Sequence, residues 1–301
     1  MIWGYGTGEG MVNPSPILLK LETHPHALIT GSSGSGKSYA LMYLIGNLLQ
    51  ENPDIELYVL DFKYSDDFEF LTGCEHYFKG DECYDGVMEY YDKFSKRRKK
   101  RDTGKRMLLI YDEYPSSILY YGGNDKRDKT KKATEITNAI AEMLMLGRGI
   151  KVGVWIVTQR ADASLFANGS RDSFMVILGM GRMSREQKGM IFAGEDIPDK
   201  VYHQGEGCLL ADGYPLYEVK IPRIRDMVDW KTYKAGVTQL TMCSLLANPK
   251  GTQAVMHVGV SITPTCTNIY KPSKYNVFQA FTTLHKINRG IEWTHNQICI
   301  N

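Results

Sequence analysis

The chain has 301 residues, of which 43% are hydrophobic and 23% are charged, and its formal net charge is +2. This is the composition of an ordinary globular protein. No run approaches the ~18 apolar residues that a membrane helix needs, and the N-terminus lacks a signal-peptide pattern, so we expect a cytoplasmic protein without a membrane segment. The six cysteines include no C-x-x-C pair, which favours reduced thiols over a disulfide framework or a zinc site.

The N-terminal segment, residues 1–26, is rich in glycine and then in proline, and it predicts a short strand or hairpin. From residue 27 to about residue 221, strand-like and helix-like stretches alternate, which predicts an α/β fold with a mostly parallel sheet flanked by helices. We therefore expect one domain over residues 27–225, followed by a C-terminal segment over residues 226–301.

A phosphate-binding loop lies at residues 31–38, which match the pattern G-x-x-x-x-G-K-[ST] between an apolar strand (residues 27–30) and an amphipathic helix (residues 38–50). Its glycines let backbone N–H groups cradle phosphate oxygens, so the pattern predicts a site for ATP and Mg²⁺. Lys37 is expected to reach the β- and γ-phosphates and Ser38 to ligate Mg²⁺. A glycine-serine turn that matches by chance is the alternative. The predicted nucleotide-binding residues are Gly31, Ser32, Ser33, Gly34, Ser35, Gly36, Lys37, Ser38 and Tyr39.

A second strand with functional residues covers residues 107–111, a continuous apolar run typical of a strand buried on both faces. Asp112 and Glu113 follow it. Asp112 is expected to hold the Mg²⁺ shell, and Glu113 to act as the general base that polarises the attacking water. An acidic pair that only caps the next helix is the alternative.

A third strand, residues 152–157, is followed by Thr158, Gln159 and Arg160. A polar amide at the tip of this strand can touch both the γ-phosphate and the attacking water, so Gln159 is predicted to couple hydrolysis to movement. Further strands are predicted at residues 57–61, 174–178, 208–210 and 216–221, and helices at residues 84–101, 130–147 and 184–192.

Two basic clusters stand out. The first covers residues 96–101, and the second follows Gly122 and Gly123 in what we predict to be a loop beyond the acidic strand. Solvated helix ends explain such runs most often. We expect the second cluster to contact DNA, with the first as a peripheral alternative. The predicted DNA-binding residues are Lys126, Arg127, Lys129, Lys131 and Lys132.

The C-terminal segment differs in character. Residues 231–301 contain seven Lys and Arg residues against one acid, Glu292, and apolar residues are scattered without a clear period. Three interpretations stay open: an irregular or β-rich appendage, a poorly ordered tail, or an end unrelated to the body of the chain. A basic segment of this kind can attract phosphate backbones without sequence preference.

Several motifs together resemble the FtsK/SpoIIIE motors of the FtsK–HerA group, over about residues 1–225. They are His24-Pro25-His26 ahead of the first strand, Asp61-Phe62-Lys63, the stretch from Gly147-Arg148-Gly149 to Thr158-Gln159-Arg160, Arg171-Asp172-Ser173-Phe174, Ile191-Phe192-Ala193-Gly194 and Gly205-Glu206-Gly207.

The resemblance implies a RecA-like P-loop ATPase fold, a hexameric ring, and movement of double-stranded DNA through its channel. In such rings an arginine of one subunit stabilises charge at the site of its neighbour. Arg148 is the first candidate for this catalytic role and Arg171 the second.

The absence of a membrane segment and of a recognisable winged-helix domain favours a shortened motor from a plasmid, phage or integrative element, with a relaxase or a membrane channel component as partner. A type VII protein-secretion ATPase is the alternative, because those motors share the core. A small-molecule kinase is the third hypothesis, although Glu113 and Gln159 suit the hydrolysis of ATP better.

Overall fold

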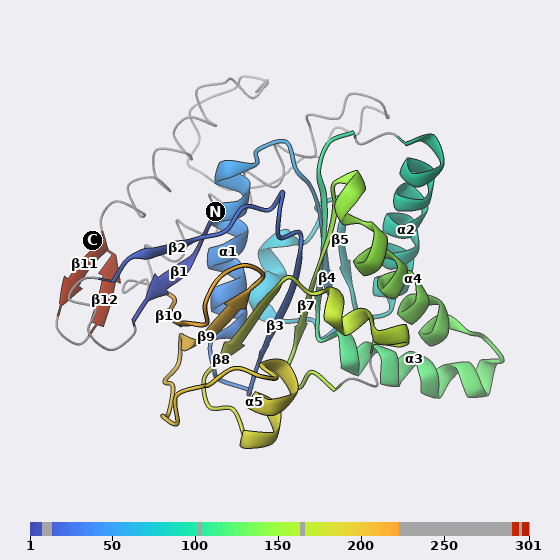
Figure 1. Cartoon of the computed structure of the whole chain (residues 1–301). Coiled ribbons are helices and arrows are strands. Elements are labelled where there is room, and N and C mark those ends of the chain that lie inside the picture. The colour runs from blue at the N-terminus through green and yellow to red at the C-terminus, as the bar shows by residue number, and fades with distance from the viewer. Residues whose placement is uncertain (8–13, 102–103, 163–165, 223–290, 295–296, 301) are drawn as a thin grey trace, which may run out of the picture.

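A computed structural model describes residues 1–7, 14–101, 104–162, 166–222, 291–294 and 297–300 (Figure 1). The strands of its main sheet are β1 (Ile2–Gly6), β2 (Pro16–Leu18), β3 (His26–Gly31), β4 (Glu56–Asp61), β5 (Tyr77–Lys79), β6 (Met107–Asp112), β7 (Val152–Thr158), β8 (Val176–Met180), β9 (Glu206–Ala211) and β10 (Tyr217–Lys220). They are ordered β2-β1-β10-β9-β8-β3-β7-β6-β4-β5.

The sheet has a parallel and an antiparallel part. The strands from β8 to β5 in this order run parallel, and β9, β10, β1 and β2 extend the sheet with antiparallel pairs. The predicted hairpin near the N-terminus is β1–β2, and β1 also pairs with β10, so the N-terminal segment belongs to this same sheet.

Helices cover both faces of the parallel part (Figure 1). They are α1 (Lys37–Glu51), α2 (Cys83–Lys100), α3 (Tyr114–Asp128), α4 (Lys132–Leu146) and α5 (Arg185–Ile191), with 3-10 turns η1 (Asp66–Leu71), η2 (Gly80–Glu82), η3 (Arg148–Ile150) and η5 (Ala167–Ser173). No helix in the described ranges is both long and apolar enough to cross a bilayer.

The core consists of two layers, one on each face of the sheet. Leu108 and Ile110 of β6 pack in the layer that contains α1, whereas Leu109 and Tyr111 pack in the layer that contains α2, α3 and α4. Successive side chains of a strand point to opposite faces, so a strand covered on both sides must be apolar throughout. This explains the continuous apolar run at residues 107–111.

Local signals fit the helix ends. α1 is buried continuously from Ala40 to Leu49 and ends just before Pro53, which disfavours helical backbone in the residue preceding it. The last turn of α2 contains Arg97, Arg98, Lys99 and Lys100, which complement the negative end of the helix dipole. The first predicted basic cluster is therefore mostly a helix end.

Of the C-terminal segment, the described residues form a separate antiparallel hairpin of β11 (Ile291–Thr294) and β12 (Gln297–Ile300). Our three interpretations of residues 226–301 otherwise concern residues outside the described ranges.

Candidate active site

The phosphate-binding loop joins β3 to α1, and the backbone needs its glycines. Gly34 and Gly36 have φ angles of +76° and +94°, in the left-handed region that favours glycine. A side chain at Gly31 would bring its Cβ to 2.4 Å from the carbonyl oxygen of Met180. Lys37 Nζ donates hydrogen bonds to the carbonyl oxygens of Gly31, at 2.6 Å, and Ser32, at 3.0 Å. Ser38 and Tyr39 follow in the first turn of α1, both half-buried.

Ser35 anchors the loop to a segment far along the chain. The Gly205 N–H donates to the Ser35 carbonyl oxygen at 2.9 Å. A Cβ on Gly181 would lie 2.6 Å from that of Ser35, so this approach also requires glycine. The Ser35 hydroxyl is buried and has no hydrogen-bond partner within the described part of the chain. A buried hydroxyl without a partner suits a loop whose remaining donors face a bound phosphate.

Asp112 ends β6 at the same sheet edge as the loop, and it is buried. Burial raises the pKa of its carboxyl to about 7, and the neighbouring charges of Glu113 and Asp61 act in the same direction. Lys37 opposes them. Burial lowers the pKa of Lys37 itself, whereas Glu113 and Asp112 raise it. The raised pKa means that the nearby positive charge does not fully stabilise the ionised Asp112 carboxylate, so a bound divalent cation would stabilise it further.

Glu113 follows β6 and contacts residues that follow the two neighbouring strands, β4 and β7. Its backbone is left-handed, with φ 55°, and its side chain is buried. The carboxylate oxygen Oε1 lies 2.8 Å from Lys63 Nζ and accepts a hydrogen bond of 3.1 Å from Gln159 Nε2. Ser116 Oγ donates to the other oxygen, Oε2, at 3.4 Å. The structure thus brings Glu113 and Gln159 together as expected and adds Lys63.

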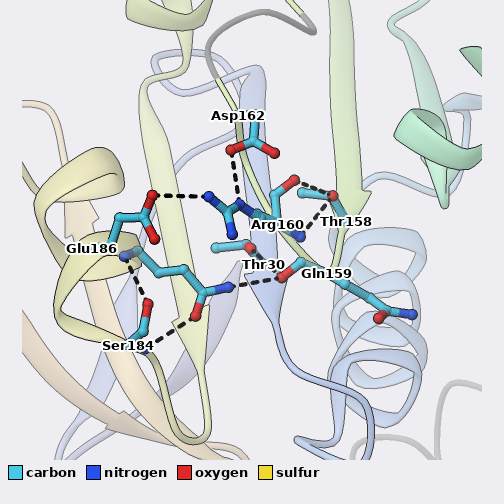
Figure 2. A network of polar contacts seen from close by, with 8 residues as sticks. Thr30, Thr158, Gln159, Arg160, Asp162, Ser184 and Glu186 are labelled. Atoms are coloured by element: carbon cyan, nitrogen blue, oxygen red, sulfur yellow. Dashed lines mark hydrogen bonds and ion pairs between the residues drawn. The ribbon is translucent and has the colours of Figure 1, made fainter. Parts of the chain in front are cut away.

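Gln159 is also tied to the elements around it (Figure 2). Its carbonyl oxygen accepts from Thr30 Oγ1 at 3.5 Å and from Gln187 Nε2 of α5 at 3.4 Å. Beside it, Arg160 pairs with Asp162 and with Glu186 of α5, each at 2.9 Å. In Figure 2 the Gln159 side chain points away from this network, so the residue links the Glu113 carboxylate to α5.

Arg148 and Arg171 lie apart from their own phosphate loop. Arg148 is exposed in η3 before the amino end of β7, whereas Gln159 follows the carboxyl end of that strand. Arg171 is half-buried in η5, ahead of β8. Burial and, secondarily, the charge of Arg148 lower the pKa of His26 to about 4. These positions exclude both arginines from the cluster around Glu113 in the same chain.

Our prediction that the second basic cluster lies in a glycine-containing loop is wrong, because helix α3 covers Gly122 and Gly123. Lys126 and Arg127 are in the last turn of α3, and Lys132 begins α4. Asp125 accepts the N–H groups of Lys132 and Ala133, each at 2.9 Å, and so caps α4. Arg127 pairs with Asp128, and Lys132 lies over the Tyr84 ring. Lys126, Lys129 and Lys131 are exposed.

Asp61 and Lys63 lie at the site, although neither is among the predicted site residues. In the sequence, the motif Asp61-Phe62-Lys63 contributes only to the family resemblance. Because carboxyl ends of parallel strands meet at one edge, its position after a predicted strand was a usable signal for a site residue.

The donor set fits a nucleotide with Mg²⁺. A hydroxyl from Ser38 and a carboxylate from Asp112 are oxygen ligands, which Mg²⁺ prefers, together with phosphate oxygens. The glycine backbone at Gly34 and Gly36 leaves the loop free of side chains at these two positions.

The chain is similar to known proteins in sequence and in fold. The model of the FtsK/SpoIIIE family matches residues 5–109. The FtsK domain-containing protein YdcQ of Bacillus subtilis (strain 168) is 29% identical over 185 residues, which are 56% of this chain and 36% of YdcQ. The chain therefore corresponds to about a third of that relative's length.

Three solved structures share the fold. EssC (ATPases 2 and 3) from Geobacillus thermodenitrificans has a TM-score of 0.61 at 13% identity, and the match covers 82% of this chain and 49% of the solved chain. The pCW3 conjugation coupling protein TcpA, in its monomer form with ATPγS, has a TM-score of 0.56 at 20% identity, and the match covers 72% of this chain and 64% of the solved chain. The cytoplasmic domain of the type VII secretion ATPase EccC of Thermomonospora curvata has a TM-score of 0.57 at 18% identity, and the match covers 79% of this chain and 30% of the solved chain. The fold is that of a P-loop ATPase.

Proposed function

The chain belongs to the FtsK/SpoIIIE family, and from this premise we propose that it is an ATP-hydrolysing motor that moves double-stranded DNA. It works as a hexameric ring, in DNA transfer or segregation. The observation that carries the hydrolytic part is the convergence of Lys63 and Gln159 on Glu113 at the edge where the phosphate loop lies.

The residues have distinct roles in this proposal. Lys37 and the loop backbone bind the phosphates, and Ser38 with Asp112 would hold Mg²⁺, which supplies charge neutralisation at the β- and γ-phosphates. Glu113 takes the proton of the attacking water. Gln159 senses the γ-phosphate side of the site and, through Gln187, is connected to α5. A buried base in contact with a strand-tip amide supports hydrolysis over transfer of phosphate to a metabolite.

The DNA part is supported by the family and by the likeness to a conjugation coupling protein. Exposed Lys126, Lys129 and Lys131 are the proposed DNA contacts of highest priority, because Arg127 and Lys132 already contact Asp128 and Tyr84. A relaxase or a membrane channel component is the expected partner in DNA transfer.

A protein-secretion motor is the second candidate, because EssC and EccC, the latter named a type VII secretion ATPase, share the fold. The two functions differ in substrate. We expect duplex DNA at low salt to raise the ATPase rate of the assembled protein, with Glu113→Gln as the inactive control. A wild-type rate that is unchanged by duplex DNA contradicts the DNA motor and favours the secretion motor.

A further inference from the structure

The two oxygens of the Glu113 carboxylate are held very differently. Oε1 receives the Lys63 ammonium at 2.8 Å and the Gln159 amide at 3.1 Å. Among the residues that the structure describes, Oε2 receives only the Ser116 hydroxyl, at 3.4 Å, which is a weak hydrogen bond. Lys63 follows β4 and Gln159 follows β7, the two strands that flank β6, so Oε1 is held from both sides.

The ion pair with Glu113 draws the Lys63 side chain toward the buried part of this sheet edge. Its side chain is 45% exposed, whereas that of Glu113 is 9% exposed, so Lys63 extends from the surface to a buried carboxylate. A charged partner makes the stronger hydrogen bond of the two that Oε1 receives. The left-handed backbone of Glu113 fixes the direction in which its side chain leaves the chain, and the Lys63 ion pair then fixes the rotation of the carboxylate.

We propose that Lys63 is a positioning residue for ATP hydrolysis: with Gln159 it holds Oε1 of Glu113 and leaves Oε2 as the atom that accepts the proton of the attacking water. In that step the water oxygen bonds to the γ-phosphorus as its proton passes to Oε2. The bridging P–O bond breaks, and its electron pair leaves with ADP. This inference rests on the proposed ATPase function.

The contacts distinguish this role from direct binding of phosphate. Lys37 donates to the loop carbonyls, whereas Lys63 pairs with Glu113 and affects Lys37 only through its charge, which adds to the effect of burial in lowering the pKa of Lys37. Loss of Lys63 should therefore leave the affinity for nucleotide unchanged and lower only the rate of hydrolysis. Outer-shell residues that orient metal ligands typically contribute about 10- to 100-fold to activity, and we expect an effect of the same size from Lys63.

The test compares Lys63→Met and Lys63→Arg with a matched control. Lys200→Met is that control, because Lys200 is also 45% exposed and pairs with a carboxylate, Glu218, that is 12% exposed. We expect K63M to lower kcat about 10- to 100-fold at an unchanged KM, K63R to recover part of the loss, and K200M to have the wild-type rate. An equal rate in K63M and wild type overturns the proposal, as does a rise in KM with kcat unchanged.

Two further measurements distinguish positioning from a general structural effect. If Lys63 acts through Glu113, K63M should add almost nothing to Glu113→Gln, whereas independent effects multiply. At equilibrium, K63M should weaken binding of ADP with aluminium fluoride, which mimics the transferring phosphate, and leave binding of ADP alone unchanged. Multiplying effects, or equal losses for both ligands, contradict the assignment.

The outcomes also separate this inference from the proposed function. A wild-type protein that binds ATP and never hydrolyses it contradicts the proposed ATPase. A wild-type protein that hydrolyses ATP while K63M keeps the full rate contradicts the role of Lys63 alone.

Discussion

Asp61 and Asp112 lie directly opposite each other on the neighbouring parallel strands β4 and β6, and both carboxyl groups are buried. Asp61 Oδ2 accepts from the Ser65 N–H at 2.8 Å and from the Tyr77 hydroxyl at 3.1 Å. Burial raises the pKa of Asp61, and the charge of Asp61 contributes to the raised pKa of Asp112. Two adjacent buried acids make the ionised site unfavourable unless a cation is near.

This pair predicts a pH-dependent stability. The pKa of Asp112 is about 7 in the folded protein against 3.8 ordinarily, so its favourable contribution is complete below about pH 4 and is lost as the pH rises through 7. Asp112→Asn should therefore raise the melting temperature at pH 8, measured with EDTA and without nucleotide, and the gain should shrink at pH 5. Asp199→Asn, at an exposed position, is the control. A pH-independent difference between D112N and wild type contradicts the prediction.

At the nucleotide site, we expect one substitution to abolish ATP binding and another to lower turnover while binding persists. Lys37→Ala removes the cation of the phosphate loop and should largely abolish ATP binding. Glu113→Gln keeps the shape of the side chain and removes the base, so binding should persist while turnover falls about 10²- to 10⁴-fold. Nucleotide affinity and steady-state turnover measured on both variants check this. Normal turnover in E113Q would refute the role of Glu113.

Arg148 predicts complementation between subunits. Because η3 precedes β7 and Gln159 follows it, a catalytic role for Arg148 would require the site of a neighbouring chain. Arg148→Ala should lower the rate about 10³- to 10⁵-fold if it stabilises the transferring phosphate. Mixing R148A with K37A subunits should restore activity where an intact loop faces an intact arginine. Normal activity of R148A without such rescue would shift the assignment to Arg171.

The α3–α4 turn predicts the salt dependence of DNA binding. Replacing Lys126, Lys129 and Lys131 by Gln should flatten the slope of log affinity against log salt by up to about 0.9 per lost phosphate contact. The same change at Lys96, Lys99 and Lys100, at the end of α2, should have less effect. Equal effects at both places would remove the α3–α4 turn as the DNA contact.

Much of the site could be predicted from the sequence because it depends on strand ends. The phosphate loop, Asp112 and Gln159 each follow an apolar run, and parallel strands place such positions at one edge. Likewise, α2 begins at Cys83 and α4 ends at Leu146, each within a residue of the predicted bounds. These elements have a clear apolar period and buried faces.

Helix α3 could not be predicted in this way. Its polar composition and the pair Gly122-Gly123 argue against a helix locally. It forms because Tyr114, Ser117 and Tyr121 are buried at helical spacing and Pro115 occupies the first turn. The role of Lys63 was missed for another reason: a lysine after a strand has no local signal for its partner, which is 50 positions away.

The hydrogen bond from Gly205 to Ser35 has a consequence for synthesis on the ribosome. β3 cannot pair with its neighbours until β7 and β8 have been synthesised, and the loop cannot form its contact with Gly205 until that residue has been added. A nascent chain therefore contains the complete phosphate-binding motif for about 170 further residues before the contacts that shape it exist. Premature termination before residue 205 should yield a product that has the motif and does not bind ATP.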